Sequence, residues 1–439
     1  MKRSIQVLAI VFALTVLGAG PTEAQNRYIV QTTGGLGSVL NLCAVLGCQV
    51  HGALDGSIGQ TYLVTSSTNL LSGLLNGTLN FLEQLLGITT IEADRLLPIP
   101  VHPMSTVPSG LYDTAPVNYY GSVVYHGYAA QPAAQIIRLG DAQRGFAISG
   151  TGIVAVIDTG VDTAHPVLRP VLLSGYDFTR NQPGASEWLD VPQLNGGTTS
   201  SSQDQDPVIV QQSSAAILDQ SSAAILDGGP YSAFGHGTMT CGLVHLVAPT
   251  AKILPLKAFT SSGTGYLSNI VAALYYAVSH SAKVVNMSFD VSDPSAALTQ
   301  AASYANEKGV VLVAAAGNEN TSAPVYPAAL NGKVVGIAST SDGDTRSSFS
   351  NYGSADVWIA APGEYVISTF PGGTYGSASG TSFSSPLVAG TAALLLSAKP
   401  SLDQANAANA LTHAIHLTPD LNHGRLDVYQ ATSAWINSH

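Results

Sequence analysis

The chain has few charged residues, few cysteines and no long apolar segment beyond its N-terminus. Only 10% of its 439 residues are Asp, Glu, Lys or Arg, against about 25% in an average soluble protein. The 16 basic residues are outnumbered by 27 acidic ones, which argues against a nucleic-acid partner, because that would need a basic surface. Three cysteines are too few for a fold held together by disulfides. No apolar run after the N-terminus approaches the ~20 residues of a membrane-spanning helix, so a polytopic membrane protein is not expected.

Hydrophobic residues, by contrast, are abundant. They make up 46% of the chain, which is enough to fill a core and argues against disorder. The length allows one large domain or two to three smaller ones.

The N-terminus has the pattern of an export signal. Lys2 and Arg3 precede an apolar stretch over residues 5–17, and small and polar residues follow up to Ala24. This pattern predicts a secretory signal peptide over residues 1–24 and an extracellular protein. A membrane anchor is the alternative, and the short apolar run disfavours it. No twin arginine is present, so the general export route is expected.

The three cysteines would then meet an oxidising environment. Cys43 and Cys48 could pair with each other. Cys241 lies in an apolar, helix-like stretch and is expected to stay a buried free thiol.

Two regions precede the largest part of the chain. Residues 25–99 are interpreted as a small α+β unit, and residues 100–130 as a linker that contains the maturation region, because Pro, Gly, Tyr and Ser dominate there without a clear period. Within the unit, apolar patterns predict strands over 27–33, 60–65 and 88–97 and helices over 36–46 and 71–86.

Residues 131–439 alternate between strand-like and helix-like segments. This alternation predicts an α/β domain with a mostly parallel central sheet and helices on both faces. The strand candidates are nearly all apolar, as strands buried on both faces should be; they span residues 152–157, 252–258, 283–288, 310–315 and 334–338. The clearest helical segments are 267–280 and 295–308.

A polar insert over residues 181–230 interrupts this alternation. It contains a perfect tandem octapeptide, Gln-Ser-Ser-Ala-Ala-Ile-Leu-Asp, at 212–219 and 220–227. The favoured interpretation is a duplication in a tolerant surface loop. A substrate-side or partner-binding loop is the alternative.

The first two chemical motifs contain a carboxylate and an imidazole. Asp158, in Asp-Thr-Gly, follows a strand candidate, and the carboxyl ends of such strands are where open α/β sheets bind ligands. His236 lies between two glycines at the start of a helix-like run. The glycines would let a substrate backbone approach closely. Taken singly, a strand-end Asp is more often a turn former and a lone His more often structural.

The other two motifs contain an amide and a hydroxyl. Asn318, in Ala-Ala-Gly-Asn, directly follows a strand candidate and could donate a hydrogen bond to a developing oxyanion. Ser382, in Gly-Thr-Ser, precedes a long apolar helix whose N-terminal N–H groups favour negative charge. A Ser at this position is otherwise most often an N-cap.

Together the four motifs resemble the subtilisin-like serine proteases, or subtilases. The order Asp158, His236, Ser382 matches this family's triad order, with Gly-Asn between the second and third members. Residues 348–353, 361–363 and 424–428 extend the resemblance, which covers about 131–439. Residues 26–99 resemble, on weaker sequence grounds, the ferredoxin-like inhibitory propeptide of these enzymes.

The resemblance implies a secreted serine endopeptidase made as a zymogen. Ser382 would attack the scissile carbonyl, His236 would transfer the proton, and Asp158 would hold the imidazole. Asn318 would bind the oxyanion. The expected partners are protein or peptide substrates and the chain's own propeptide as an intramolecular inhibitor. We expect a monomer that is not attached to a membrane after signal cleavage. We expect no nucleic-acid partner and no cofactor.

The sequence also departs from the family pattern. Val167 stands where many members have an Asp that ligates calcium, so the usual strong calcium site is in doubt. The expected substrate-binding residues are Ser288, Phe289, Asp290 and Val325. Asp290 stands where Gly is usual. Val325 precedes a Tyr-Pro pair and would fill the far end of the pocket, which predicts cleavage after small or medium apolar residues.

Three other classes were weighed against this interpretation. An aspartic protease needs two Asp-Thr-Gly or Asp-Ser-Gly motifs, and only one is present unless the protein dimerises. A serine-carboxyl peptidase shares Gly-Thr-Ser but has Glu in place of His236 and Asp in place of Asn318. A catalytically inactive binding protein on the same fold should have lost a triad residue, and none is lost.

Overall fold

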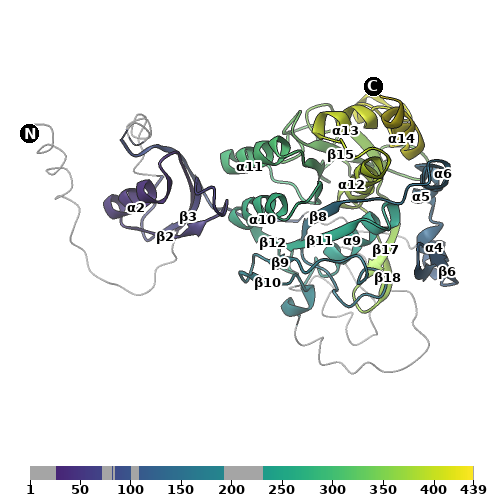
Figure 1. Ribbon diagram of the computed structural model, residues 1–439, viewed down its shortest axis with the longest axis horizontal. Helices are drawn as coiled ribbons and strands as arrows, with labels where there is room; N and C mark the ends of the chain where they lie inside the picture. The colour runs from purple at the N-terminus through teal and green to yellow at the C-terminus, as the bar shows by residue number, and fades with distance from the viewer. Residues whose placement is uncertain (1–25, 72–81, 83–84, 100–107, 192–230, 439) are drawn as a thin grey trace, which may run out of the picture. The chain divides into compact units, whose positions relative to one another are not determined.

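The computed structural model describes residues 26–71, 82, 85–99, 108–191 and 231–438 (Figure 1). The expected signal peptide, most of the helix predicted over 71–86 and the octapeptide repeat lie outside these residues. The chain forms two compact units, Met1–Arg95 and Leu96–His439.

The first unit is a four-stranded antiparallel sheet with one described helix. Its elements are β1 (Asn26–Thr32), α2 (Gly35–Leu46), β2 (Cys48–Ala53), β3 (Thr61–Ser66) and β4 (Ile88–Ala93). The strand order is β2-β3-β1-β4, and each neighbouring pair is antiparallel. The core that joins the sheet to α2 includes Val30, Val39, Leu42, Val64 and Ile88.

Most sequence predictions for this unit are confirmed. The strands predicted over 27–33 and 60–65 and the helix over 36–46 are present as β1, β3 and α2. β2 was not predicted, because it lies largely exposed and lacks the alternation of a half-buried strand. Cys43 and Cys48 form a disulfide across the α2–β2 turn.

The second unit contains an eight-stranded sheet in the order β10-β9-β11-β8-β13-β14-β15-β16. All its pairs are parallel except β9–β10. The strands are β8 (Ile153–Asp158), β9 (Tyr176–Asp177), β10 (Gln182–Pro183), β11 (Lys252–Lys257), β13 (Val284–Met287), β14 (Val311–Ala315), β15 (Val335–Thr340) and β16 (Ile359–Pro362). The five predicted strands are present as β8, β11, β13, β14 and β15. They could be predicted because long apolar runs mark strands covered on both faces.

Helices cover this sheet on both sides (Figure 1). α9 (His236–Val247) and α12 (Thr381–Ala398) pack against each other and the sheet, and α10 (Leu267–Ser279) and α11 (Ala296–Glu307) form a second pair. α12 is apolar and long enough to cross a membrane, but 89% of its apolar window is buried inside the protein. It is the central core helix, and its first turn carries Ser382.

The remaining elements lie around this layer structure. They are β5 (Leu96–Pro98), β6 (Pro116–Tyr119), β7 (Ser122–Tyr125), β12 (Thr264–Tyr266), β17 (Val366–Phe370), β18 (Thr374–Ala378), α4 (His126–Ala129), α5 (Pro132–Ile136), α6 (Leu139–Gly145), α13 (Gln404–Leu411), α14 (Val428–Asn437), η1 (Ser109–Tyr112), η2 (Glu187–Asp190) and η3 (Pro419–Leu421). The predicted final strand over 88–97 divides at Asp94–Arg95 into β4 in the first unit and β5 in the second.

Two parts of the chain differ from their sequence interpretation. Residues 108–130, expected to be a linker, fold into the second unit and bury Leu111, Val124 and Tyr128 in its main core. Short elements of four residues leave no periodic signal, so composition alone misassigned them. Residues 181–191 of the polar insert are also folded and contain the fully buried Glu187.

Candidate active site

Asp158 and His236 form a buried pair at the carboxyl end of the sheet. Asp158 is the last residue of β8, and His236 is the first residue of α9. His236 Nδ1 lies 2.7 Å from Asp158 Oδ1, and both side chains are buried. The other carboxylate oxygen accepts from Thr240 Oγ1 at 3.1 Å. Because the carboxylate only accepts, Nδ1 carries the proton and Nε2 presents its lone pair.

The Nε2 atom of His236 is buried and has no hydrogen-bond partner among the described residues. A buried polar atom without a partner is costly, so such an atom indicates a site that a substrate completes. Gly237 allows this close packing, since a Cβ there would lie 1.9 Å from the Gly160 carbonyl oxygen.

Ser382 lies at the second position of α12, in the first turn of the helix. Its side chain is 1% exposed, and Oγ donates to the Ser288 carbonyl at 3.1 Å. The next residue, Phe383, has its ring 5.3 Å from the His236 ring. The starts of α9 and α12 therefore meet, which brings the hydroxyl and imidazole motifs to one place although they are far apart in the chain.

Asn318 follows β14 (Val311–Ala315) and faces the start of α12. Its Oδ1 accepts from Thr381 N at 2.9 Å and from Thr381 Oγ1 at 3.0 Å. These two donors fix which end of the amide is oxygen. The Nδ2 group is buried and has no partner in the described part of the chain. A donor is thus available next to Ser382, as an oxyanion site requires.

Comparison with known proteins identifies the family. The sequence model of the subtilase family matches residues 150–430. The chain belongs to the subtilase family. It is 34% identical over 277 residues to thermitase from Thermoactinomyces vulgaris, a match that covers 61% of this chain and 80% of thermitase. It is 32% identical to subtilisin Savinase from Lederbergia lenta over 274 residues, which cover 60% of this chain and 83% of Savinase. The protein is therefore a subtilisin-like serine endopeptidase, a hydrolase.

Solved structures agree with this assignment. A cold adapted subtilisin-like serine proteinase superposes with a TM-score of 0.50 at 28% identity, covering 64% of this chain and 89% of that chain. A lanthipeptide protease superposes with a TM-score of 0.53 and covers 70% of this chain and 93% of its own. At 23% identity the second likeness shows the fold alone.

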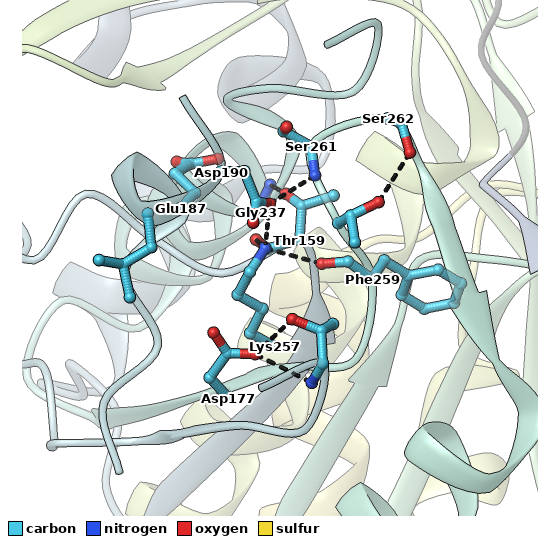
Figure 2. A network of polar contacts seen from close by, with 12 residues as sticks. Thr159, Asp177, Glu187, Asp190, Gly237, Lys257, Phe259, Ser261 and Ser262 are labelled. Carbon is cyan, nitrogen blue, oxygen red and sulfur yellow. Dashed lines mark hydrogen bonds and ion pairs between the residues drawn. The ribbon is translucent and has the colours of Figure 1, made fainter. Parts of the chain in front are cut away.

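A polar network in this subtilase joins the loop after β8 to the start of α9 (Figure 2). Lys257, the last residue of β11, is fully buried. Its Nζ donates to the carbonyls of Thr159 at 2.6 Å and Phe259 at 2.8 Å, and to Asp190 at 2.6 Å. Each donor of the ammonium group has a partner, so the network holds the loop after Asp158 without an unpaired buried charge.

Glu187 extends this network to the start of α9. One carboxylate oxygen accepts from Gly235 N at 2.8 Å, and the other accepts from Thr238 Oγ1. Burial raises the pKa of Glu187 to about 8, and the two hydrogen bonds and Lys257 oppose this rise. The carboxylate contacts the residue just before His236, so it is placed to position the imidazole.

Neither Glu187 nor Lys257 was predicted from the sequence as a site residue. Lys257 follows four apolar residues of β11, a place from which an ion would normally be excluded, and that position was the available signal. Glu187 lies in a segment interpreted by its polar composition as a loop, and nothing local marked it as buried.

Of the expected substrate-binding residues, Ser288 contacts Ser382 directly. The Ser288 carbonyl accepts from Ser382 Oγ, and Ser288 Oγ donates to the Ser382 carbonyl at 2.7 Å. The fully buried Phe289 packs against Phe259, with ring centroids 5.1 Å apart. Val325 is 6% exposed.

Asp290, the next residue along this segment, is electrostatically unusual. Burial raises its pKa to about 8, and the nearby carboxylates of Glu319 and Asp356 add to the rise. Its Oδ2 atom is buried and has no hydrogen-bond partner among the described residues.

Val167, the residue expected to weaken the usual calcium site, is 2% exposed and belongs to the main core. In the described part of the chain no group of three or more His, Cys, Asp or Glu side chains could hold a metal ion. Cys241 is a buried free thiol, as predicted.

Proposed function

We propose that this subtilase is a secreted endopeptidase that hydrolyses peptide bonds through the hydroxyl of Ser382. His236 Nε2 accepts the hydroxyl proton as Oγ attacks the scissile carbonyl, and the imidazolium then gives that proton to the leaving amine. Water later takes the place of the amine and hydrolyses the acyl-enzyme by the same proton transfers. Asp158 holds the imidazole and stabilises its charged form.

The oxyanion is held by two donors at the start of α12. Asn318 Nδ2 and the backbone N–H of Ser382 would bind the carbonyl oxygen as negative charge develops on it. The observation that carries this proposal is the orientation of the Asn318 amide. Thr381 N donates to the oxygen end at 2.9 Å, and the nitrogen end is a buried donor with no partner in the described part of the chain.

The experiment is labelling with a fluorophosphonate, which reacts with an activated serine. Wild type should be labelled and Ser382→Ala should not. Ser384→Ala is the matched control, because Ser384 lies two residues further along the same helix and its buried hydroxyl has no partner among the described residues. Unlabelled wild-type protein would contradict the proposal and favour an inactive binding protein on this fold.

We also propose that residues 25–99 act as an inhibitory propeptide. The sheet order β2-β3-β1-β4, with a helix between β1 and β2, supports the ferredoxin-like fold expected for such a segment. Further support comes from β5, which pairs antiparallel with β12. Ile99 N donates to the Gly263 carbonyl at 2.6 Å and continues this pairing.

The pairing of β5 with β12 resembles a bound peptide strand. Leu97 and Ile99 are buried, whereas Leu96 between the units is 58% exposed. Ile99, which follows β5, lies near Ala233, three residues before His236. A Cβ added at Gly263 would lie 3.8 Å from Ile99 Cβ and 3.2 Å from Ala233 Cβ. Because residues from 108 onward belong to the second unit's core, we place the maturation cleavage between Ile99 and Pro108.

Secretion is proposed on two grounds. The first is the signal-like pattern of residues 1–24. The second is the Cys43–Cys48 disulfide, because disulfides persist in oxidising compartments and are rare in the cytosol.

A further inference from the structure

Two carboxylates near the expected substrate-binding residues each have one buried oxygen without a hydrogen-bond partner among the described residues. The Ser382 hydroxyl donates to the Ser288 carbonyl at 3.1 Å, and Asp290 lies two residues further along the chain from Ser288. Two residues of extended chain span about 7 Å. Asp290 is therefore within reach of a substrate side chain whose own carbonyl is at Ser382. Its Oδ2 atom is buried without a hydrogen-bond partner among the described residues.

Asp356 approaches the same place from the other side. It is 1% exposed, and its Oδ1 accepts from Val325 N at 3.1 Å. Its Oδ2 atom, like that of Asp290, has no partner in the described part of the chain. Tyr326, next to Val325, exchanges two backbone hydrogen bonds of 2.7 Å with Val291, the residue after Asp290. The two carboxylates thus flank one short paired stretch, the one expected to close the pocket.

Glu319 adds a third negative charge but is itself satisfied. Its Oε2 accepts from Asn318 N and from Asn351 Nδ2, both at 2.9 Å. Burial raises the pKa of Asp356 to about 6, and the charges of Glu319 and Asp356 contribute to the raised pKa of Asp290. Burying ionised carboxylates close together is costly without a cation, so a cation bound beside them would stabilise their ionised forms.

We propose that this pocket binds the cationic side chain of a Lys or Arg residue that precedes the scissile bond, with Asp290 as its acceptor and Asp356 as a second negative charge behind it. The proposal rests on the proposed function, in which Ser382 is the nucleophile. Ammonium and guanidinium groups carry only hydrogen-bond donors. The Oδ2 atoms of Asp290 and Asp356 are acceptors that have no donor among the described residues. The apolar stem of either side chain would pack on Val325.

This proposal and the apolar preference expected from Val325 alone make opposite predictions for one peptide series. The series varies only the residue before the scissile bond among Lys, norleucine, Arg, citrulline, Ala, Leu and Phe. Norleucine and citrulline keep the length of Lys and Arg but carry no charge. We expect kcat/KM for Lys and Arg to exceed the values for norleucine and citrulline by ~10–10²-fold, as for one hydrogen bond to a charged group. Equal values, or a preference for Ala and Leu, would overturn the proposal without any variant being needed.

Asp290→Asn assigns the effect to a residue. It should lower kcat/KM for Lys and Arg peptides by ~10–10²-fold more than for the Leu peptide. Asp141→Asn is the charge-matched control, because Asp141 is exposed and pairs only on the surface with Arg144. A loss shared by Lys and Leu peptides would indicate a structural role for Asp290 and overturn the proposal.

The pH dependence gives a second readout. Only ionised Asp290 attracts a cation, and its pKa in the free enzyme is raised to about 8 by burial and by Glu319 and Asp356. KM for the Lys peptide should therefore fall between pH 6 and pH 9, whereas KM for the Leu peptide should not follow this change. In Asp290→Asn the difference should disappear.

Two controls separate the possible failures. If fluorophosphonate labels Ser382 and Leu peptides are cleaved without a cationic preference, the specificity proposal alone fails. If neither labelling nor cleavage occurs, both proposals fail. Repeating the series with a chelator and with added calcium tests a metal ion in the pocket, and calcium-dependent stability that Asp290→Asn abolishes without altering the peptide preference would overturn the proposal.

Discussion

At the scale of single residues, the site depends on which polar atoms are left without partners. Asp158 occupies His236 Nδ1, and Thr381 occupies the oxygen of Asn318. In each case another nitrogen of the same side chain, His236 Nε2 or Asn318 Nδ2, is buried and has no partner among the described residues. The structural cost of two unsatisfied groups is thus concentrated at the reaction site, where a developing oxyanion would accept from Asn318 Nδ2 and His236 Nε2 would accept the proton of Ser382.

Replacing Asn318 tests its role in the transition state. Asn318→Leu should lower kcat by ~10²–10³ with little change in KM, the range found when one oxyanion donor is removed from a subtilisin. Asn318→Asp is the sharper variant, because it keeps an oxygen for Thr381 but replaces the free donor with an acceptor. Steady-state kinetics on one peptide measures both. A rise in KM at constant kcat would assign Asn318 to ground-state binding instead.

The four motif residues could be predicted from sequence because each follows a recognisable strand or begins a helix. Their environment could not. The proposed acceptor role of Asp290 depends on Asp356, which lies 66 positions further along the chain and meets it only through the pairing of Val291 with Tyr326. A sequence pattern does not show that Asp290 and Asp356 lie close together. From the sequence, the expectation of an apolar pocket therefore rested on Val325 alone.

At the scale of elements, α9 is anchored at its first turn by η2. Glu187 accepts from Gly235 N and from Thr238 Oγ1, on either side of His236. Gly235 has φ +89°, and a Cβ there would lie 2.2 Å from Phe370, so glycine is required at this turn. The start of α9 is therefore fixed by packing on one side and by a buried carboxylate on the other.

Glu187→Gln should change how stability depends on pH. The pKa of Glu187 is raised in the folded protein from 4.5 to about 8 by burial. The unfolded chain releases this proton first, so stability is lost as pH rises from about 4.5 towards 8. The shift corresponds to an upper limit of about 5 kcal/mol. Glutamine cannot ionise, so the variant's melting temperature relative to wild type should increase between pH 5 and pH 9.

Thermal melts of fluorophosphonate-inactivated protein would measure this difference without autolysis. Glu187→Ala serves as the comparison, because it also cannot ionise but removes the acceptor for Gly235 N. Its melting temperature should lie below that of Glu187→Gln at every pH. A constant offset between Glu187→Gln and wild type across the pH range would contradict the raised pKa.

Element prediction succeeded where one physical cause dominates. β8, β11, β13, β14 and β15 are covered on both faces, so their sequences are continuous apolar runs. It failed at residues 108–130 and at residues 181–191, where short segments are held by contacts with distant parts of the chain. Tyr128, for example, donates to the Gly242 carbonyl at 2.7 Å, and neither residue's local sequence indicates that bond.

At the scale of the whole molecule, the larger unit contains all four motif residues of the candidate site. The larger unit is built from parallel strands whose partners are far apart in sequence, such as β8 between β11 and β13. Non-local pairing of this kind folds slowly. We propose that the first unit assists that folding, and that β5, which pairs with β12 as an added strand, then blocks the site.

Removal of the first unit should therefore depend on the enzyme's own nucleophile. We predict that Ser382→Ala, made in a protease-free host, is secreted with the residues before about 108 still covalently attached, whereas wild type loses them. The cleavage cannot lie much later in the chain, because Leu111 and Val124 are 1% exposed in the core of the catalytic unit. Intact-mass measurement and N-terminal sequencing of both proteins give the result directly.

Ser384→Ala should be trimmed like wild type, which controls for the loss of a buried hydroxyl on the same helix. Wild-type trimming of Ser382→Ala would show that another protease performs the cleavage, and the first unit would then be a separately removed domain and not the substrate of this active site.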